Sequence, residues 1–180
     1  MKKITLFEMP IWKTSIPNWK TKKKKLENEL NSYEEIKKAP ANFASNRWVK
    51  EKKELVIVFY NIFKEQLNKF SHEIQSNYEI TDIWSSSYEQ GDYQNPHNHG
   101  TSGYTGIVYL DFPKKSQPTQ FVQPWNDEVL DHTILTHIDV KEGDMLLFSK
   151  SILHFSPAHK NKKRKRILSW DMSPKPWLKR

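Results

Sequence analysis

Residues 96–112 read PHNHGTSGYTGIVYLDF, and the interpretation of the whole chain starts from this stretch. Side chains two positions apart in an extended strand point to the same side, so His97 and His99 can present two imidazoles to one metal ion. In a chain with 7 histidines, a His-x-His pair is weak evidence by itself. However, His154 follows the apolar stretch LLFSKSIL at 146–153 and could complete the site from a remote strand.

The segments on either side of the His-x-His pair have the pattern of strands. Residues 83–88, IWSSSY, alternate as a half-buried strand does, and a turn follows at Gln90-Gly91-Asp92. Residues 103–112 are rich in β-branched and aromatic side chains and stop at Pro113. The histidines therefore lie where a strand meets a loop, which is where a rigid scaffold usually displays functional groups.

Composition limits the class of protein. A chain of 180 residues with 36% hydrophobic residues, including 7 Trp, 7 Tyr and 9 Phe, predicts one domain with an aromatic core. The chain has no apolar run long enough for a membrane span, and its start, MKKITLFE, is too short and too soon charged for a signal peptide. We therefore expect a soluble, cytoplasmic protein with no membrane partner.

Cysteine content and charge narrow the chemistry further. The absence of cysteine excludes disulfides, thiolate zinc sites and cysteine nucleophiles, so a metal must be held by His, Asp or Glu. The formal net charge of +8 is compatible with nucleic acid as a partner, but lysine-rich surfaces also serve solubility. In the basic run HKNKKRKR at 159–166, a solvated hairpin tip is favoured over a nucleic-acid patch.

Hydrophobic periodicity predicts helices first and strands afterwards. A helix is expected over 18–38 and a second over about 50–75, because their apolar residues recur at intervals of three and four. From residue 80 onward short alternating runs predict strands at 83–88, 103–112, 119–122, 133–140, 145–149, 153–156 and 167–172. This order indicates an α+β protein whose β part is a sandwich or barrel.

The order of these motifs resembles the double-stranded β-helix oxygenases that use iron(II) and 2-oxoglutarate, and more narrowly their prolyl-hydroxylase-like branch with small bacterial and phage members. The matching features are Tyr88, the His-x-His pair, GIVYL at 106–110, GDMLLF at 143–148, His154 and an arginine opening the last strand. The resemblance covers roughly residues 80–173. It implies a single oxygenase domain over 1–180, in which a jelly-roll or cupin-like barrel over 80–173 is supported by mainly helical residues 1–79.

The resemblance also implies a metal site. The family holds iron through His-x-Asp or His-x-Glu and a distal His, which leaves positions open for co-substrate and O2. Here His97 matches the first ligand and His154 the distal one, while His99 stands in place of the carboxylate. We favour a three-histidine site over the alternative in which Asp92 substitutes for the missing carboxylate. No catalytic residue beyond the metal centre is predicted, and His72, His132 and His137 are expected to be ordinary surface or sheet residues.

A 2-oxoglutarate pocket follows from the same resemblance. The far carboxylate of 2-oxoglutarate needs a cation inside the barrel, and an arginine fork suits it. Arg166 is favoured because it directly precedes the apolar strand 167–172, with Arg164 as the alternative. Tyr109 is expected to help hold this carboxylate and Tyr88 to line the pocket, with simple core packing as the alternative for both tyrosines.

The reaction implied by the resemblance is hydroxylation of a substrate carbon, with 2-oxoglutarate decarboxylated to succinate. A peptidyl proline or another protein side chain is the favoured substrate, and nucleic acid is less favoured. A cupin-type metal enzyme that does not use 2-oxoglutarate, and a non-enzymatic basic module that binds nucleic acid, remain as alternatives.

Overall fold

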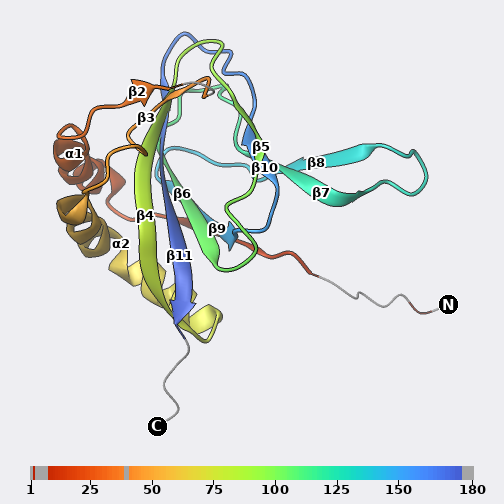
Figure 1. The fold of residues 1–180 in the computed structure, drawn as a ribbon, viewed down its shortest axis with the longest axis horizontal. Helices are drawn as coiled ribbons and strands as arrows, with labels where there is room; N and C mark the ends of the chain where they lie inside the picture. The colour runs from red at the N-terminus through yellow and green to blue at the C-terminus, as the bar shows by residue number, and fades with distance from the viewer. Residues whose placement is uncertain (1, 3–7, 39–40, 176–180) are drawn as a thin grey trace.

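The computed structural model describes residues 2, 8–38 and 41–175. Within them the chain forms three layers (Figure 1), in which helices α1 (Trp19–Leu30) and α2 (Lys53–Glu73) cover one face of a seven-stranded sheet. A four-stranded sheet lies against the other face, and every strand pairing is antiparallel. The fold is therefore α+β, with the two facing sheets of a double-stranded β-helix.

The seven-stranded sheet has the order β1-β9-β6-β11-β4-β3-β2. Its strands are β1 (Ile11–Ser15), β2 (Ile36–Lys37), β3 (Ala44–Ser45), β4 (Asn77–Tyr88), β6 (Tyr104–Asp111), β9 (Asp144–Ser149) and β11 (Lys165–Lys175). The four-stranded sheet has the order β5-β10-β7-β8. Its strands are β5 (Gln94–His97), β7 (Gln120–Asn126), β8 (Thr133–His137) and β10 (His154–Ser156).

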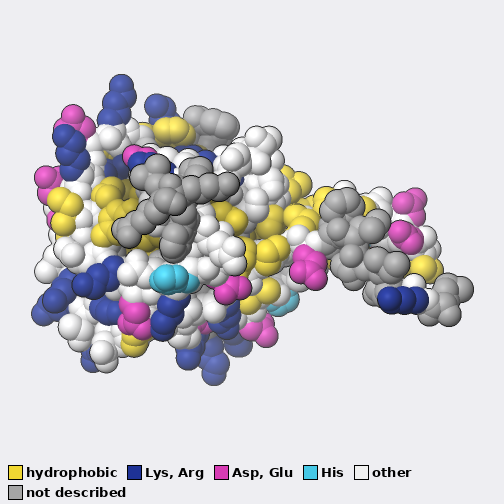
Figure 2. Space-filling model, turned by 90° about the horizontal axis from the view of Figure 1, so that it is seen from below, with side chains coloured by type: hydrophobic (Ala, Val, Ile, Leu, Met, Phe, Trp, Pro, Cys, Tyr) yellow, Lys and Arg dark blue, Asp and Glu magenta, His cyan; other side chains and the backbone are white. Residues whose placement is uncertain are grey.

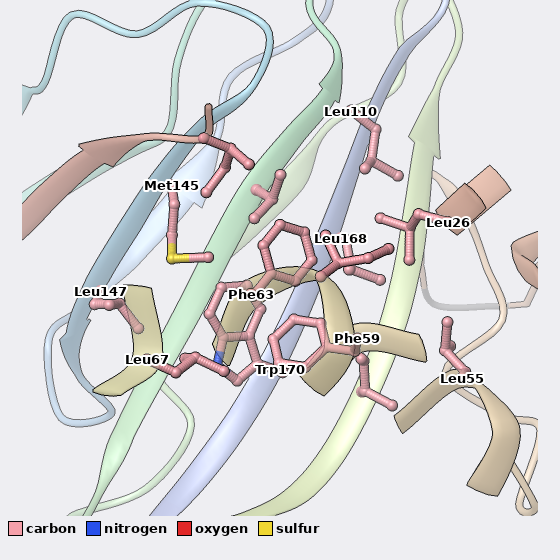
Figure 3. Close-up of a cluster of buried hydrophobic side chains, with 14 of the residues drawn as sticks. Leu26, Leu55, Phe59, Phe63, Leu67, Leu110, Met145, Leu147, Leu168 and Trp170 are labelled. Atoms are coloured by element: carbon pink, nitrogen blue, oxygen red, sulfur yellow. The ribbon is translucent and has the colours of Figure 1, made fainter. Parts of the chain in front are cut away.

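The central strands of the large sheet are buried on both faces, which explains why they are almost continuously apolar. Along β6, Ile107 and Tyr109 face the small sheet, whereas Val108 and Leu110 face the helices. Figure 3 shows the helix-side cluster, in which Trp170 of β11 packs among side chains of α2. Each fully buried large apolar side chain contributes about 1.5–3 kcal/mol relative to exposure, so this layer is a main source of stability.

Most of the predicted elements are present, but the first helix is shorter than expected. The prediction of a helix over 18–38 is wrong beyond Leu30, because residues 36–37 pair with β3 instead. Between them Glu35 reaches across to accept hydrogen bonds from Ser85 and Ser87 of β4. Helical periodicity continued past the true end of α1 because local sequence does not reveal these long-range partners. Strands β1, β2, β3 and β5 were not predicted, and β4 begins at Asn77.

The chain passes from one sheet to the other directly after His97, and this connection determines where the His-x-His pair lies. The chain leaves β5 in the small sheet and enters β6 in the large sheet through residues 98–103. Gly103 has φ +97, and a Cβ atom there would lie 2.4 Å from the Met172 carbonyl oxygen, so this position requires glycine. None of the helices in the described part of the chain has the length and hydropathy to cross a membrane.

Candidate metal centre and co-substrate pocket

Three histidines from different segments meet between the sheets. His97 ends β5 and is the register partner of His154 at the start of β10. His99 lies beyond β5 and is held by its backbone N–H, which donates to the Lys150 carbonyl at 2.9 Å. The ring centroids of His97 and His154 are 4.5 Å apart, and His99 lies 5.2 and 5.1 Å from them. Among the described residues these three form a group whose ligand atoms all lie within 4.8 Å of one another.

Hydrogen bonds orient each imidazole for metal binding. The Nδ1 atoms of His97 and His154 lie 2.8 and 2.9 Å from the carbonyl oxygens of Asn95 and Ile152. Since a carbonyl can only accept, these Nδ1 atoms carry the proton and leave the Nε2 lone pairs for a metal. The Nε2 atom of His97 already accepts from the Gln94 amide at 3.1 Å, which is consistent with an unprotonated Nε2.

Burial keeps the imidazoles of His97 and His154 neutral. Burial and, to a smaller extent, the neighbouring His97 together lower the pKa of His154 to about 3. Burial also lowers the pKa of His97, and the neighbouring His99 adds to this effect. Because a metal binds the neutral imidazole, the pocket stabilises the form that ligates. The donor set therefore fits a divalent transition metal with imidazole ligands.

No described carboxylate takes the position that the usual acidic ligand would have. Asp92 accepts a hydrogen bond from the Glu89 N–H at 3.0 Å and pairs with Lys37, away from the histidines. The alternative in which Asp92 replaces the missing ligand is therefore not supported. The carboxylate that does reach the group belongs to Asp171, whose Oδ1 lies 2.6 Å from the Nδ1 of His99.

A narrow cavity of about 20 Å³ extends from the histidines between the sheets. The residues lining it are Trp84, Tyr88, Gln94, His97, His99, Ile107, Thr119, His154, Phe155, Ser156, Ile167 and Ser169. The Tyr88 hydroxyl donates to the Gln94 side-chain oxygen at 2.9 Å, and the buried Tyr109 hydroxyl donates to the Thr119 hydroxyl at 3.1 Å. Tyr88, Gln94, Thr119 and Ser156 therefore give the cavity a polar wall, and Tyr88 lies at the end of β4 that pairs with the start of β11.

A buried cation meets this polar wall, and it is Lys165 rather than an arginine. Lys165 is only 2% exposed, its Nζ donates to the Ser156 hydroxyl at 2.6 Å, and it lies 4.5 Å over the Tyr88 ring. Burial lowers the pKa of Lys165 to about 8, and among the described residues no carboxylate pairs with its ammonium to offset this effect. Sequence reasoning missed this residue, although it shares a strand face with Ile167 and Ser169 of the cavity lining.

The structure places both predicted arginines away from the cavity. Arg166 shares the opposite face of β11 with Leu168 and Trp170, and its Nε lies 3.0 Å from Glu35 Oε1 on the helix side of the sheet. The Arg164 side chain is 48% exposed, and its guanidinium lies 3.9 Å from Asp111. A shift of one residue along a strand reverses the face, and both faces of β11 are buried, so the sequence did not distinguish them.

A second hollow opens beside His97. It has a volume of about 240 Å³ and lies between the segment 41–48, Trp84 and residues 93–97. Trp48 and Tyr93 are 47% and 40% exposed on its walls, and the Arg47 guanidinium stacks 4.2 Å from the Trp84 ring. This groove is aromatic and faces the metal-binding group, so it is suited to bind an apolar or cyclic part of a substrate.

The basic run does not form a hairpin tip. Its residues 160–164 lie in the loop between β10 and β11, which belong to different sheets. Lys160, Lys162 and Lys163 are exposed, whereas Lys165 and Arg166 are buried in β11. On the face shown in Figure 2, lysine and arginine side chains lie in separate groups around the body with acidic side chains among them. This face therefore carries no single continuous basic patch.

Comparisons with known proteins identify the class. Facing sheets that hold metal-binding side chains at one end of a cavity are the arrangement expected of a non-haem metal oxygenase, and here a histidine stands where the usual triad has a carboxylate. The family described as putative 2OG-Fe(II) oxygenase matches residues 82–171, which is half of the chain. The chain belongs to the 2OG-Fe(II) oxygenase family. It is therefore an oxidoreductase that uses iron(II), 2-oxoglutarate and O2.

Solved structures agree on the fold. Viral collagen prolyl hydroxylase from Paramecium Bursaria Chlorella virus-1, in complex with 2OG, is 17% identical with a TM-score of 0.57, covering 90% of this chain and 94% of the other. HygX from Streptomyces hygroscopicus, with nickel, 2-oxoglutarate and hygromycin B bound, is 11% identical with a TM-score of 0.70, covering 92% and 83%. A Burkholderia pseudomallei oxidoreductase of the 2OG-Fe(II) oxygenase family is 8% identical with a TM-score of 0.65, covering 89% and 84%. No curated protein sequence matches the chain.

Proposed function

We propose that His97, His99 and His154 bind the iron(II) of this oxygenase through their Nε2 atoms. The observation that carries the proposal is that these three imidazoles meet while acceptors hold their Nδ1 atoms. Three protein ligands leave room on a six-coordinate ion for a bidentate co-substrate and for O2. Iron(II), when bound, supplies the O2 activation that is coupled to oxidative decarboxylation of 2-oxoglutarate to succinate.

We further propose that Lys165, rather than Arg166 or Arg164, neutralises the far carboxylate of 2-oxoglutarate. Its ammonium is buried beside the Ser156 hydroxyl and over the Tyr88 ring, and the hydroxyls of both residues can donate to the same carboxylate. Because the cavity is narrow, these groups must exchange their mutual hydrogen bonds for bonds to the ligand. A carboxylate would also relieve the cost of burying an uncompensated ammonium.

The protein side chains contribute orientation and exclusion of water. His97 and His154 are each held by the backbone carbonyl two residues earlier in the chain, so their lone pairs are oriented before the metal arrives. Aromatic and aliphatic side chains, including Phe121 and Phe148 packed near His154, surround the group and limit access of water. The whole chain would act as one oxygenase domain, in which the helices support the large sheet.

We propose a protein or peptide side chain as the substrate, with a peptidyl proline as the first candidate. The aromatic groove beside His97 supports this choice, since a pyrrolidine ring packs well against the rings of Trp48, Trp84 and Tyr93. The structural similarity to a viral collagen prolyl hydroxylase favours the same class. In this arrangement the groove holds the peptide while the target carbon points toward the histidines.

Metal content and succinate release test the proposed function. Protein reconstituted anaerobically with Fe(II) is expected to hold about one iron per chain and to release succinate from 2-oxoglutarate under O2. His97→Ala and His154→Ala should abolish both signals. His137→Ala is the matched control, because His137 is 51% exposed on β8 and lies outside the histidine group. Full succinate release by His154→Ala would refute the proposed ligand set, and proline-containing peptides that raise the rate would support the substrate class.

A further inference from the structure

The proposed metal site lacks a negative charge. Three neutral imidazoles bring none to a divalent ion, whereas a carboxylate ligand would bring one charge directly. The described residues nevertheless place a carboxylate within hydrogen-bonding distance of one proposed ligand, because Asp171 of β11 accepts a hydrogen bond from His99 Nδ1 at 2.6 Å. Both side chains are almost completely buried, with exposures of 4% for His99 and 8% for Asp171. At this burial the charge of Asp171 is weakly screened by solvent.

The surroundings of Asp171 direct this carboxylate toward His99. Asp171 shares the inward face of β11 with Ile167 and Ser169, so its side chain lies on the same side of the sheet as the cavity. The Thr105 hydroxyl lies 3.2 Å from the same Nδ1, but its own proton is donated to the Trp170 carbonyl at 2.9 Å. The shorter hydrogen bond from His99 Nδ1 therefore goes to Asp171. A carboxylate that accepts the Nδ1 proton fixes the tautomer with a free Nε2 and raises its basicity.

We propose that Asp171 is a positioning residue that supplies to the metal, through His99, the negative charge that a carboxylate ligand would otherwise supply. His97 and His154 face neutral carbonyls, so His99 is the ligand in this group that donates to a charged acceptor. The inference rests on the proposed three-histidine site and assigns His99 a distinct role within it. On this basis His99 replaces the acidic ligand only as a pair with Asp171.

A purely structural explanation makes a different prediction. Lys150 Nζ lies 3.7 Å from Asp171 Oδ2, and its side chain is 14% exposed, so Asp171 also belongs to an ion pair. If Asp171 served only this pair, loss of either partner would have the same consequence for the site. If Asp171 acts on His99, removal of Lys150 should leave metal affinity unchanged or raise it, because a competing cation is lost.

The test uses the full chain with Co(II) as a stable stand-in for Fe(II). Asp171→Asn keeps the shape and removes the charge, and we expect it to lower Co(II) affinity by about 10- to 100-fold and to change the visible absorption of bound Co(II). Lys150→Gln breaks the same ion pair and should bind Co(II) at least as tightly as the wild type. Equal losses in both variants, or unchanged affinity in Asp171→Asn, would overturn the inference while leaving the metal site intact.

A second measurement needs neither a variant nor a metal. Long-range ¹H–¹⁵N correlation spectra of the metal-free wild type should show the proton of His99 on Nδ1 and none on Nε2. A proton on Nε2 of His99 would overturn the inference even if Asp171→Asn failed to fold. If the wild type itself takes up no Co(II) or Fe(II), the three-histidine site is refuted and the role of Asp171 falls with it.

Discussion

Replacement of Lys165 by methionine tests the co-substrate pocket most directly. Methionine fills a similar volume without the charge, and the ammonium that it removes is 2% exposed and bonded to Ser156 at 2.6 Å. A hydrogen bond to a charged partner contributes about 1.5–3 kcal/mol, so 2-oxoglutarate binding should weaken by about 10- to 150-fold. Metal affinity should change little, because the ammonium contacts none of the three histidines in the described hydrogen bonds.

The pH dependence of binding gives the same prediction a second readout. The pKa of Lys165 is lowered to about 8, so the ammonium is charged below this pH and loses its proton as the pH rises through it. Since only the charged form attracts a carboxylate, 2-oxoglutarate affinity should be highest below about pH 8 and should fall above it. In Lys165→Met this decline should be absent.

The assay is isothermal calorimetry, in which 2-oxoglutarate is titrated at several pH values into protein that has been loaded with Co(II). Arg166→Met is the matched control, because it removes a buried cation from the opposite face of the same strand, where it pairs with Glu35. It should reduce the free energy of unfolding and leave 2-oxoglutarate affinity within a few fold. Normal affinity in Lys165→Met together with lost affinity in Arg166→Met would refute the assignment and restore the arginine.

Three further outcomes are expected. Because the pKa of His154 is lowered to about 3, protons compete weakly at this ligand, and Co(II) affinity should fall by less than about tenfold between pH 7 and pH 6; a steeper loss would contradict the lowered pKa. Gly106→Ala should lower the free energy of unfolding in urea by about 1–3 kcal/mol, since its Cβ would lie 2.1 Å from a buried indole ring; unchanged stability would show that the ring can move. The exposed lysines Lys160, Lys162 and Lys163 can be changed to Glu together, and succinate release should then stay within a few fold and the free energy of unfolding within about 1 kcal/mol of the wild type. Submicromolar binding of RNA or DNA by the wild type that falls steeply with salt and is lost in this variant would instead indicate a nucleic-acid role.

Chemistry that depends on residue type and order could be predicted from the sequence. His97 and His99 are two apart, and a strand period of two puts them on one side whatever the rest of the fold does. The α+β class follows from the change in hydrophobic period near residue 80, and the long helix α2 was predicted because its apolar pattern is uninterrupted. These features are local, so they need no knowledge of which strands become neighbours.

The orientation of β11 could be decided only by tertiary structure. Its two faces are both buried, one against the helices and one against the small sheet, so burial does not mark which parity points to the cavity. Neighbouring residues of β11 lie on opposite faces, so Arg166 pairs with Glu35 while Lys165 contacts Ser156. Asp171 lies on the same face as Lys165 and therefore reaches His99. The pairing of β11 with β4 and β6 sets that parity, because strand register is determined by partners distant in sequence and not by the strand's own residues.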